Sequence, residues 1–165
     1  MPPHPTRILF VCLGNICRSP LAEAVFRHQA TERGVADRFH VDSAGTSAYH
    51  EGEPPDRRSA ATARGHGISV TGSSRSVTAE ELGGWDWVIA MDAENLAELE
   101  ALATRRDVRP RLHRLREWDP QPDGLDVPDP YFGAAGFERV HEIVSRSVGS
   151  LLDALLENGG DARSA

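Results

Sequence analysis

The sequence predicts an α/β protein with three layers, in which helices flank both faces of a four-stranded parallel sheet. Short apolar, β-branched segments alternate with helical patterns along the 165 residues. This alternation is typical of a parallel sheet that is covered on both faces. A hydrophobic content of 39% and a charged content of 26% are those of a globular chain. We expect a single domain over residues 7–157, a loose N-terminus over 1–6 and a disordered tail over 158–165.

Three apolar segments are expected to form buried strands, and a fourth segment is weaker. Continuous runs of Val, Ile, Leu and Phe between turn signals favour strands that are buried on both faces. The expected strands are Arg7–Cys12, Phe39–Ser43 and Asp86–Met91, with Arg111–Leu115 as the weaker one.

Helical patterns separate and follow these strands. The first is expected to begin at Ser19-Pro20, because serine is a good N-cap and proline suits the first helical position. It should end near Gly34, since glycine is the usual helix stop. The last helix has the clearest pattern, with apolar residues at i, i+3 and i+4 spacing. The other expected helices are 55–65, 93–103 and 137–155.

The composition excludes several function classes. The net charge is −7, which disfavours general binding to nucleic acid or to anionic membranes. All basic residues other than histidine are arginine, so a Schiff-base lysine and a Walker lysine are both excluded. No apolar run is long enough to span a bilayer and no signal-peptide pattern is present, so we expect a cytoplasmic protein.

Cys12 and Cys17 are the two cysteines of the chain. Two cysteines this close together are too few for a disulfide-stapled secreted fold. The scattered histidines supply no further ligands at zinc spacing. We therefore expect no metal and no cofactor.

The most informative segment follows the first expected strand. Ligands of open α/β sheets bind at the carboxyl ends of the strands, and the first strand ends at Cys12. A short loop before a helix N-terminus presents backbone N–H groups and the positive end of the helix dipole, which together make an anion site. Gly14 and Asn15 tolerate left-handed conformations, so the loop can curl. The expected phosphate-binding loop consists of Leu13, Gly14, Asn15, Ile16, Cys17, Arg18 and Ser19.

The side chains of this loop indicate nucleophilic catalysis. The positive potential favours the thiolate of Cys12, which is the reactive form of cysteine. Arg18 carries a planar fork that can bind two phosphate oxygens, and Ser19 offers a hydroxyl near the sulfur. The loop amides and the arginine supply the charge stabilisation, so the reaction needs no metal. We therefore expect an enzyme that attacks phosphorus with Cys12.

A proton donor is needed for the leaving oxygen, and the sequence offers several carboxyl groups. Four of them lie in one proline-rich stretch, where spacing alone makes them equal candidates. They are Asp119, Asp123, Asp126 and Asp129.

The chain resembles the low-molecular-weight protein tyrosine phosphatases over nearly its whole length. Its composition, which is rich in arginine and alanine, suggests a bacterial member. The resemblance rests first on the run Cys12–Pro20 (CLGNICRSP) and on Asp129–Gly133 (DPYFG). It extends to Asp42–Thr46 (DSAGT), Pro55-Asp56, Ala63–Ile68 (ARGHGI) and Asp92. The family's fold, a four-stranded parallel sheet with flanking helices, agrees with the prediction above.

The resemblance implies a protein-tyrosine phosphatase, which releases inorganic phosphate from tyrosine-phosphorylated proteins through a phosphocysteine. It selects Asp129 as the general acid, beside Cys12 and Arg18 as the other catalytic residues. It implies that Asn15, Ser19 and Ser43 support the loop. It also implies that Cys17 is a redox partner, which forms a reversible disulfide with Cys12 and shields the nucleophile.

The rim of the substrate pocket is expected to be apolar and aromatic. Such walls suit the flat ring of phosphotyrosine and make a deep slot, whereas phosphoserine would be too short to reach the thiolate. The expected rim residues are Leu13, Ile16, Tyr49, Tyr131 and Phe132.

Three alternatives stay open. A phosphoarginine phosphatase of the same fold is one, although those relatives carry threonine where this chain has Ile16. An arsenate reductase is the second, but that chemistry uses further cysteines downstream, and none follows Cys17. A phosphate-reading module without activity is the third, and it would require a lost nucleophile or acid.

Overall fold

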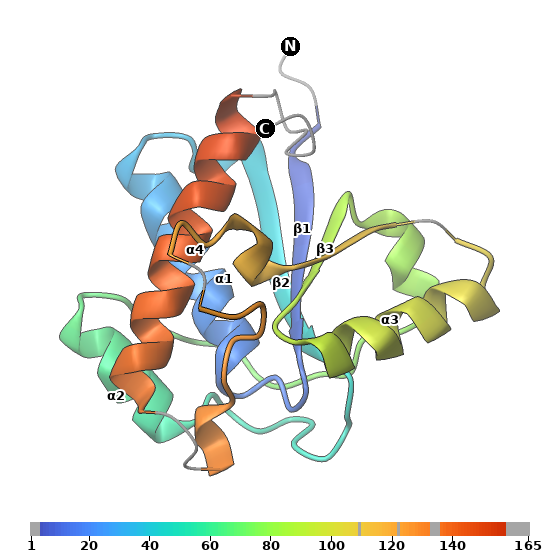
Figure 1. Ribbon diagram of the computed structural model, residues 1–165, viewed down its shortest axis with the longest axis horizontal. Coiled ribbons are helices and arrows are strands. Elements are labelled where there is room, and N and C mark those ends of the chain that lie inside the picture. The colour runs from blue at the N-terminus through green and yellow to red at the C-terminus, as the bar shows by residue number, and fades with distance from the viewer. Residues whose placement is uncertain (1–3, 109, 122, 133–135, 158–165) are drawn as a thin grey trace.

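The computed structural model describes residues 4–108, 110–121, 123–132 and 136–157. Four strands form one parallel sheet in the order β2-β1-β3-β4, which confirms the predicted sheet (Figure 1). The strands are β1 (Thr6–Cys12), β2 (Phe39–Gly45), β3 (Trp87–Ala90) and β4 (Arg111–Arg114). The tail that was expected to be disordered, 158–165, lies outside the described residues, as do residues 1–3.

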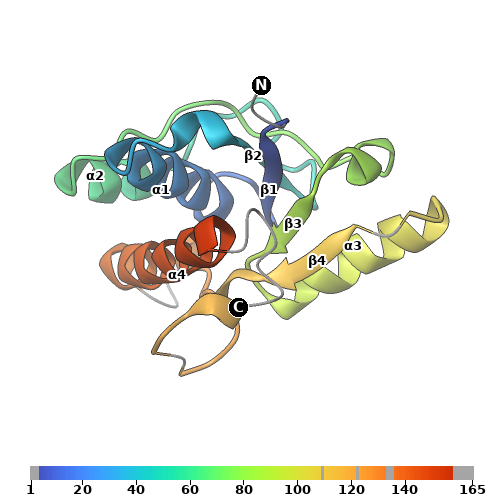
Figure 2. The same cartoon turned by 90° about the horizontal axis from the view of Figure 1, so that it is seen from above.

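Four α-helices cover the sheet, and they confirm the three-layer prediction. They are α1 (Arg18–Glu32), α2 (Arg57–Gly65), α3 (Ala93–Arg105) and α4 (Phe137–Glu157). Helices α1, α2 and α4 lie on one side of the sheet and α3 lies on the other (Figure 2). No helix in the described ranges is both long and apolar enough to cross a membrane.

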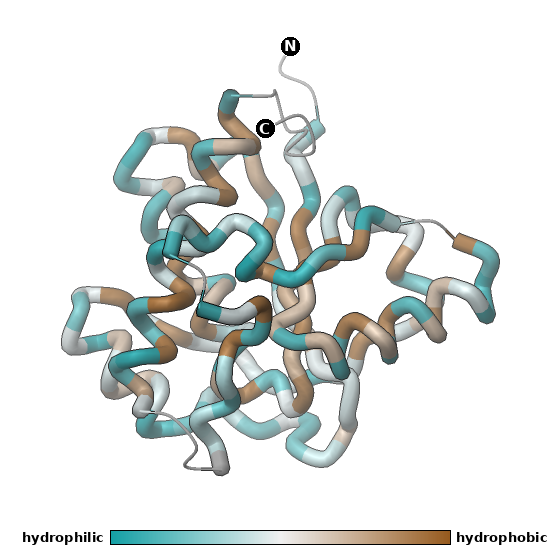
Figure 3. The backbone as a smooth tube through the Cα atoms, viewed as in Figure 1, coloured by the Kyte–Doolittle hydropathy of each residue, from teal (hydrophilic) through white to brown (hydrophobic). Residues whose placement is uncertain are grey.

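Alternation along β1 divides the apolar core between the two faces of the sheet. Ile8 and Phe10 belong to the cluster that α1 and α4 complete, while Leu9 and Val11 belong to the cluster on the α3 side. All four side chains are fully buried. Figure 3 shows that the hydrophobic segments of the backbone run through the middle of the molecule and that hydrophilic segments lie toward its outside.

The start of α1 differs from the prediction. The helix begins at Arg18, its N-cap is Cys17, and no side chain caps it. The prediction of Ser19 as the N-cap is therefore wrong, and Pro20 is the third helical residue. The hydroxyl of Ser19 is engaged elsewhere, 3.0 Å from the sulfur of Cys12. The end of the helix agrees with the prediction, because Gly34 follows it with a φ of 70°.

The carboxyl edge of the sheet gathers the loops that matter for function. Cys12 is in register with Gly45 at the ends of β1 and β2. The loop after Cys12 runs so close to β2 that a Cβ on Gly45 would lie 2.7 Å from the carbonyl oxygen of Leu13. Only glycine permits this approach, and it brings the segment after β2 against the loop after β1.

A long irregular connection joins β4 to α4. It begins with the 3₁₀ helix η3 (Leu115–Trp118) and ends with the 3₁₀ helix η4 (Pro130–Phe132). Between them, the described residues of 119–129 form neither helix nor strand. This connection carries all four of the carboxyl groups that were considered as general acids.

Candidate active site

The loop after β1 curls around the sulfur of Cys12. Asn15 has a φ of 56°, a left-handed conformation that asparagine tolerates better than most residues. This turn directs the backbone N–H of Asn15 to the Cys12 sulfur at 3.3 Å. The sulfur therefore accepts a backbone hydrogen bond and lies 3.0 Å from the Ser19 hydroxyl.

Gly14 has a different role from the one predicted. It is absent from the left-handed residues, so the curl depends on Asn15. A Cβ on residue 14 would lie 2.9 Å from the imidazole ring of His50. Glycine is required here because the segment after β2 packs directly on the loop.

The side chain of Asn15 joins three segments. Its amide nitrogen donates to the hydroxyls of Ser19 at 2.9 Å and Ser43 at 3.0 Å. Its amide oxygen accepts from the backbone N–H of Arg75 at 3.0 Å. Asn15 is 3% exposed, so these bonds are made away from water. The structure thus brings together the three predicted support residues and adds Arg75, which the sequence did not single out.

Arg18 lies next to the sulfur with much of its hydrogen-bonding capacity already used. Nη1 donates to Asp92 at 2.7 Å and to the carbonyl of Val127 at 2.9 Å. Nη2 donates to Asp129 at 3.3 Å. Burial opposes the charge, but Cys12, Asp92 and Asp129 together raise the pKa of the guanidinium above its ordinary value. Arg18 therefore stays protonated, and it connects the loop to the segment that carries Asp129.

The four candidate acids occupy different places. Asp129 lines the same pocket as Cys12, and none of the other three does. Asp119 is buried against Arg116 and Arg146. Asp126 accepts from the backbone N–H of Ala93 at 3.0 Å. Its place in the wall of the pocket that contains Cys12 distinguishes Asp129 from the other three acids, which sequence spacing alone did not.

A pocket of about 400 Å³ opens above Cys12. Its walls include the predicted residues Leu13, Ile16, Tyr49 and Tyr131. The side chain of Phe132, also predicted for the rim, lies outside what the structure describes. Two lining residues were not predicted, Ser47 and His50. Their position just after the second strand, at the carboxyl edge of the sheet, is the signal that could have found them.

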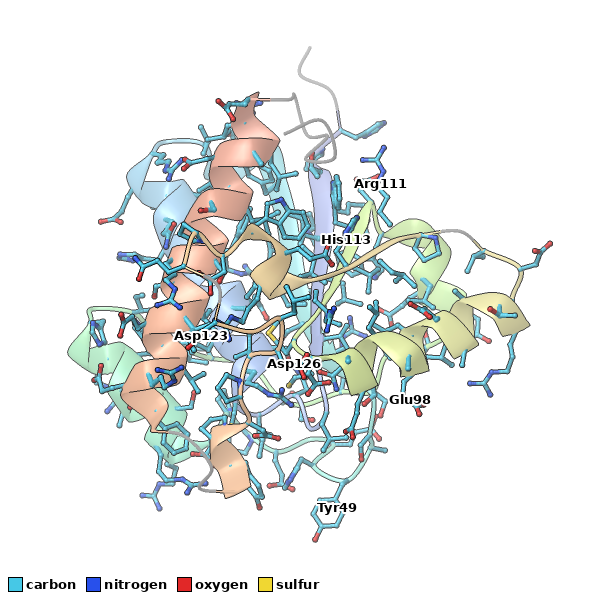
Figure 4. All side chains as sticks on the ribbon, viewed as in Figure 1. Tyr49, Glu98, Arg111, His113, Asp123 and Asp126 are labelled. Carbon is cyan, nitrogen blue, oxygen red and sulfur yellow. The ribbon has the colours of Figure 1, made fainter. Side chains whose placement is uncertain are left out.

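The rim residues differ in how firmly they are held. Ile16 is 7% exposed, whereas Leu13 is 41% and Tyr49 is 83% exposed. Tyr49 points away from the body of the molecule (Figure 4). Tyr131 is better supported, since its ring packs on His50 with centroids 5.4 Å apart. The inner wall is therefore built from Ile16 and Tyr131, with Tyr49 at the outer edge.

Cys17 lines the pocket but lies at the N-cap of α1 and is buried. Burial, together with the negative charge of Asp56, raises the pKa of its thiol far above the ordinary value. Cys17 is therefore a neutral thiol at physiological pH, whereas a nucleophilic cysteine has to be a thiolate.

Comparison with known proteins identifies relatives of this chain. A family model described as low molecular weight phosphotyrosine protein phosphatase matches residues 7–160. A Streptomyces coelicolor protein, named low molecular weight protein-tyrosine-phosphatase, is 43% identical over 155 residues, which cover 92% of this chain and 94% of that protein.

Solved structures show the same fold. YfkJ from Bacillus subtilis aligns with a TM-score of 0.89 and 37% identity, covering 96% of this chain and 99% of that one. An arginine phosphatase from Drosophila aligns with a TM-score of 0.83 and 31% identity, covering 88% of this chain and 95% of that one.

Proposed function

The chain belongs to the low molecular weight phosphotyrosine protein phosphatase family, and we propose that it hydrolyses its substrate through a phosphocysteine formed on Cys12. It is a protein-tyrosine phosphatase, a hydrolase of phosphoric monoesters. The observation that carries the mechanism is the sulfur of Cys12 at the base of the pocket, with the Asn15 N–H at 3.3 Å and Asp129 in the same wall.

The first step transfers the phosphoryl group to sulfur. The Cys12 thiolate attacks phosphorus in line with the tyrosine oxygen, so the S–P bond forms as the P–O bond breaks. Asp129 gives its proton to the departing oxygen, which leaves as neutral tyrosine. Loop N–H groups and the Nε–H of Arg18 stabilise the oxygens of the transferring group.

The second step regenerates the enzyme. Asp129, now a carboxylate, accepts a proton from water as that water attacks phosphorus. The S–P bond breaks, inorganic phosphate leaves and Cys12 returns to the thiolate. The protons balance over the two steps, because Asp129 gives one proton to the tyrosine oxygen and then takes one from the attacking water.

Phosphotyrosine fits the depth and the lining of the pocket. The buried wall at Ile16 and the ring of Tyr131 provide apolar contact for an aromatic ring between the sulfur and the surface. Phosphoserine lacks the length to place its phosphorus at the sulfur while its backbone stays outside. We therefore infer that the substrates are tyrosine-phosphorylated proteins.

The experiment that tests this proposal compares phosphate release from two peptides of the same sequence, one with phosphotyrosine and one with phosphoserine. We expect kcat/KM to be at least roughly a hundredfold higher for the phosphotyrosine peptide, because the shorter side chain loses most of the general acid and positioning contributions. Equal kcat/KM values for the two peptides would overturn it.

A further inference from the structure

The connection that carries Asp129 is held by one buried arginine. Arg116 belongs to η3, at the start of the connection, and is 3% exposed. Arg116 does not line the pocket. An arginine buried to this degree is costly unless its donors are satisfied.

Arg116 satisfies its donors within the segment between η3 and η4. Nε donates to the carboxylate of Asp119 at 2.9 Å. Nη1 donates to the backbone carbonyl of Asp126 at 2.9 Å, and Nη2 donates to the carboxylate of Asp123. A single guanidinium thus binds three points of one irregular segment, which has no helix or strand to fix its path.

A second arginine ties the same segment to α4. Nε of Arg146 donates to Asp119 at 2.8 Å, and its Nη2 donates to the carbonyl of Gln121 at 3.2 Å. The Asp119 side chain is fully buried between the two arginines. Burial alone would raise its pKa, but the hydrogen bonds from Arg146, the Gln121 N–H and Arg116 hold that pKa below the ordinary value. Asp119 is therefore an ionised link between α4 and Arg116.

The segment held in this way leads directly to the general acid. The side chains of Asp123 and Asp126 are more than half exposed, and Asp126 accepts from the backbone N–H of Ala93, at the start of α3, at 3.0 Å. The backbone N–H of Val127, the next residue, donates to Met91 at 2.8 Å at the end of β3. Asp129 follows two residues later, and its carboxylate accepts from the N–H of Tyr131 at 3.0 Å. The backbone position of Asp126 and Val127 therefore limits the positions that the Asp129 carboxyl group can take.

We propose that Arg116 is a positioning residue for general acid catalysis, which acts by fixing the 119–126 segment and so the distance of Asp129 from the leaving oxygen. This inference rests on the proposed function, because it assumes that Asp129 is the acid. Arg116 touches no substrate. Its loss should therefore reduce proton donation while leaving the nucleophile and the phosphate loop intact.

The test uses leaving groups that differ in their need for a proton. Turnover of phenyl phosphate needs protonation of a basic oxygen, whereas 2,4-dinitrophenyl phosphate leaves without it. In Arg116→Met we expect kcat/KM, which reports the first step, to fall by roughly tenfold or more for phenyl phosphate and to change by less than about threefold for the dinitrophenyl ester. In an Asp129→Asn background, Arg116→Met should cause no further selective fall, because the two changes remove the same step.

A milder variant guards against loss of folding. Asp123 is more than half exposed, and Asp123→Asn removes the negative charge from one of the three contacts of Arg116. We expect the same selective loss, of about two- to fivefold, for phenyl phosphate. The matched control is Asp153→Asn, since Asp153 is an exposed carboxylate that also pairs with an arginine, Arg33. If Arg116→Met does not fold, Asp123→Asn decides the question.

The outcomes separate this inference from the proposed function. An equal fall of kcat/KM for both esters in Arg116→Met, or a further selective fall in the Asp129→Asn background, would overturn the role of Arg116. The same holds if Asp123→Asn behaves as Asp153→Asn does. If Asp129→Asn itself shows no dependence on the leaving group, the assignment of the acid fails, and the role of Arg116 fails with it.

Discussion

The side-chain amide nitrogen of Asn15 lies 3.0 Å from the hydroxyl of Ser43, a hydrogen bond that joins the phosphate loop to β2. Asn15 is also the left-handed residue of the loop. One side chain thus fixes both the curl of the loop and its attachment to the sheet. A curl fixed before substrate arrives keeps the amides directed at a common centre, which is the condition for electrostatic stabilisation of the reacting phosphoryl group.

Replacing Asn15 tests this attachment. Asn15→Ala leaves the hydroxyls of Ser19 and Ser43 and the N–H of Arg75 without their partner, and it places alanine in a left-handed conformation. We expect a loss of about 1–3 kcal/mol in the free energy of unfolding and a fall in kcat of roughly tenfold or more. Urea unfolding and steady-state kinetics measure the two effects. Ser43→Ala removes one of the three Asn15 bonds together with the bond from Ser43 to Glu23, so its kcat should fall less than that of Asn15→Ala. An Asn15→Ala enzyme with normal kcat would speak against a preformed loop.

Ile16 should set the preference between phosphotyrosine and phosphoarginine. Its buried side chain lines the pocket and is apolar, so it offers no hydrogen bond to a guanidinium group. We expect the wild type to prefer a phosphotyrosine peptide to a phosphoarginine peptide, and Ile16→Thr to narrow the ratio of kcat/KM by roughly tenfold. Phosphate release from the two peptides measures this ratio. A ratio that is unchanged in Ile16→Thr would remove Ile16 as the determinant.

Cys17 should protect the nucleophile from irreversible oxidation. Mild peroxide converts the Cys12 thiolate to a sulfenic acid, which can condense with the Cys17 thiol to give a disulfide and water. Mass spectrometry of peroxide-treated enzyme should show a Cys12–Cys17 bridge that a dithiol reverses. Cys17→Ser should instead accumulate sulfinic acid on Cys12. Sulfinic acid in the wild type without any bridge is the result that would count against this role.

His141 should make the stability of the fold depend on pH. Its ring stacks on His66 with centroids 4.0 Å apart, and its Nδ1 is buried without a hydrogen-bond partner in the described part of the chain. Burial, reinforced by His66, lowers the pKa of His141 below 6.5, although Glu138 opposes the shift. The unfolded chain therefore binds more protons just below pH 6.5, and this contribution to stability is complete above that pH and is lost as the pH falls toward the folded pKa.

Denaturant unfolding between pH 7.5 and pH 5 tests the effect of His141. His141→Phe keeps a stacked ring but cannot be protonated, so its free energy of unfolding should fall less over this range than that of the wild type. If the free energies of unfolding of the wild type and His141→Phe change in parallel with pH, His141 contributes nothing to the pH dependence.

The sequence predicted the parts of the site that lie close together along the chain. Strand β1, the loop and the start of α1 are consecutive along the chain. The spacing from Cys12 to Arg18 is therefore enough to predict that the two residues lie at the same loop. The contacts of Asn15 with Arg75 and of Arg18 with Asp92 join residues far apart in sequence, and no local pattern signals them. The role of Gly14 was missed for the same reason, since it depends on the approach of His50.

The choice among the four acids shows the same limit. Asp119, Asp123, Asp126 and Asp129 have the same chemistry and similar neighbours in the sequence. They differ in what lies opposite them in the fold, which is Arg116 and Arg146 for the first and the pocket for the last. Motif resemblance selected Asp129, and packing supplies the physical reason for the difference.

Trapping the covalent intermediate tests the central claim most directly. In Asp129→Ala the base for the second step is missing, so p-nitrophenyl phosphate should give a burst of nitrophenol equivalent to the enzyme, followed by slow turnover. Acid quenching and peptide mass spectrometry should then find one phosphoryl group on the sulfur of Cys12. The Cys12→Ser enzyme should show neither burst nor turnover. A phosphoryl group on any other residue, or full turnover by Cys12→Ser, would contradict the account.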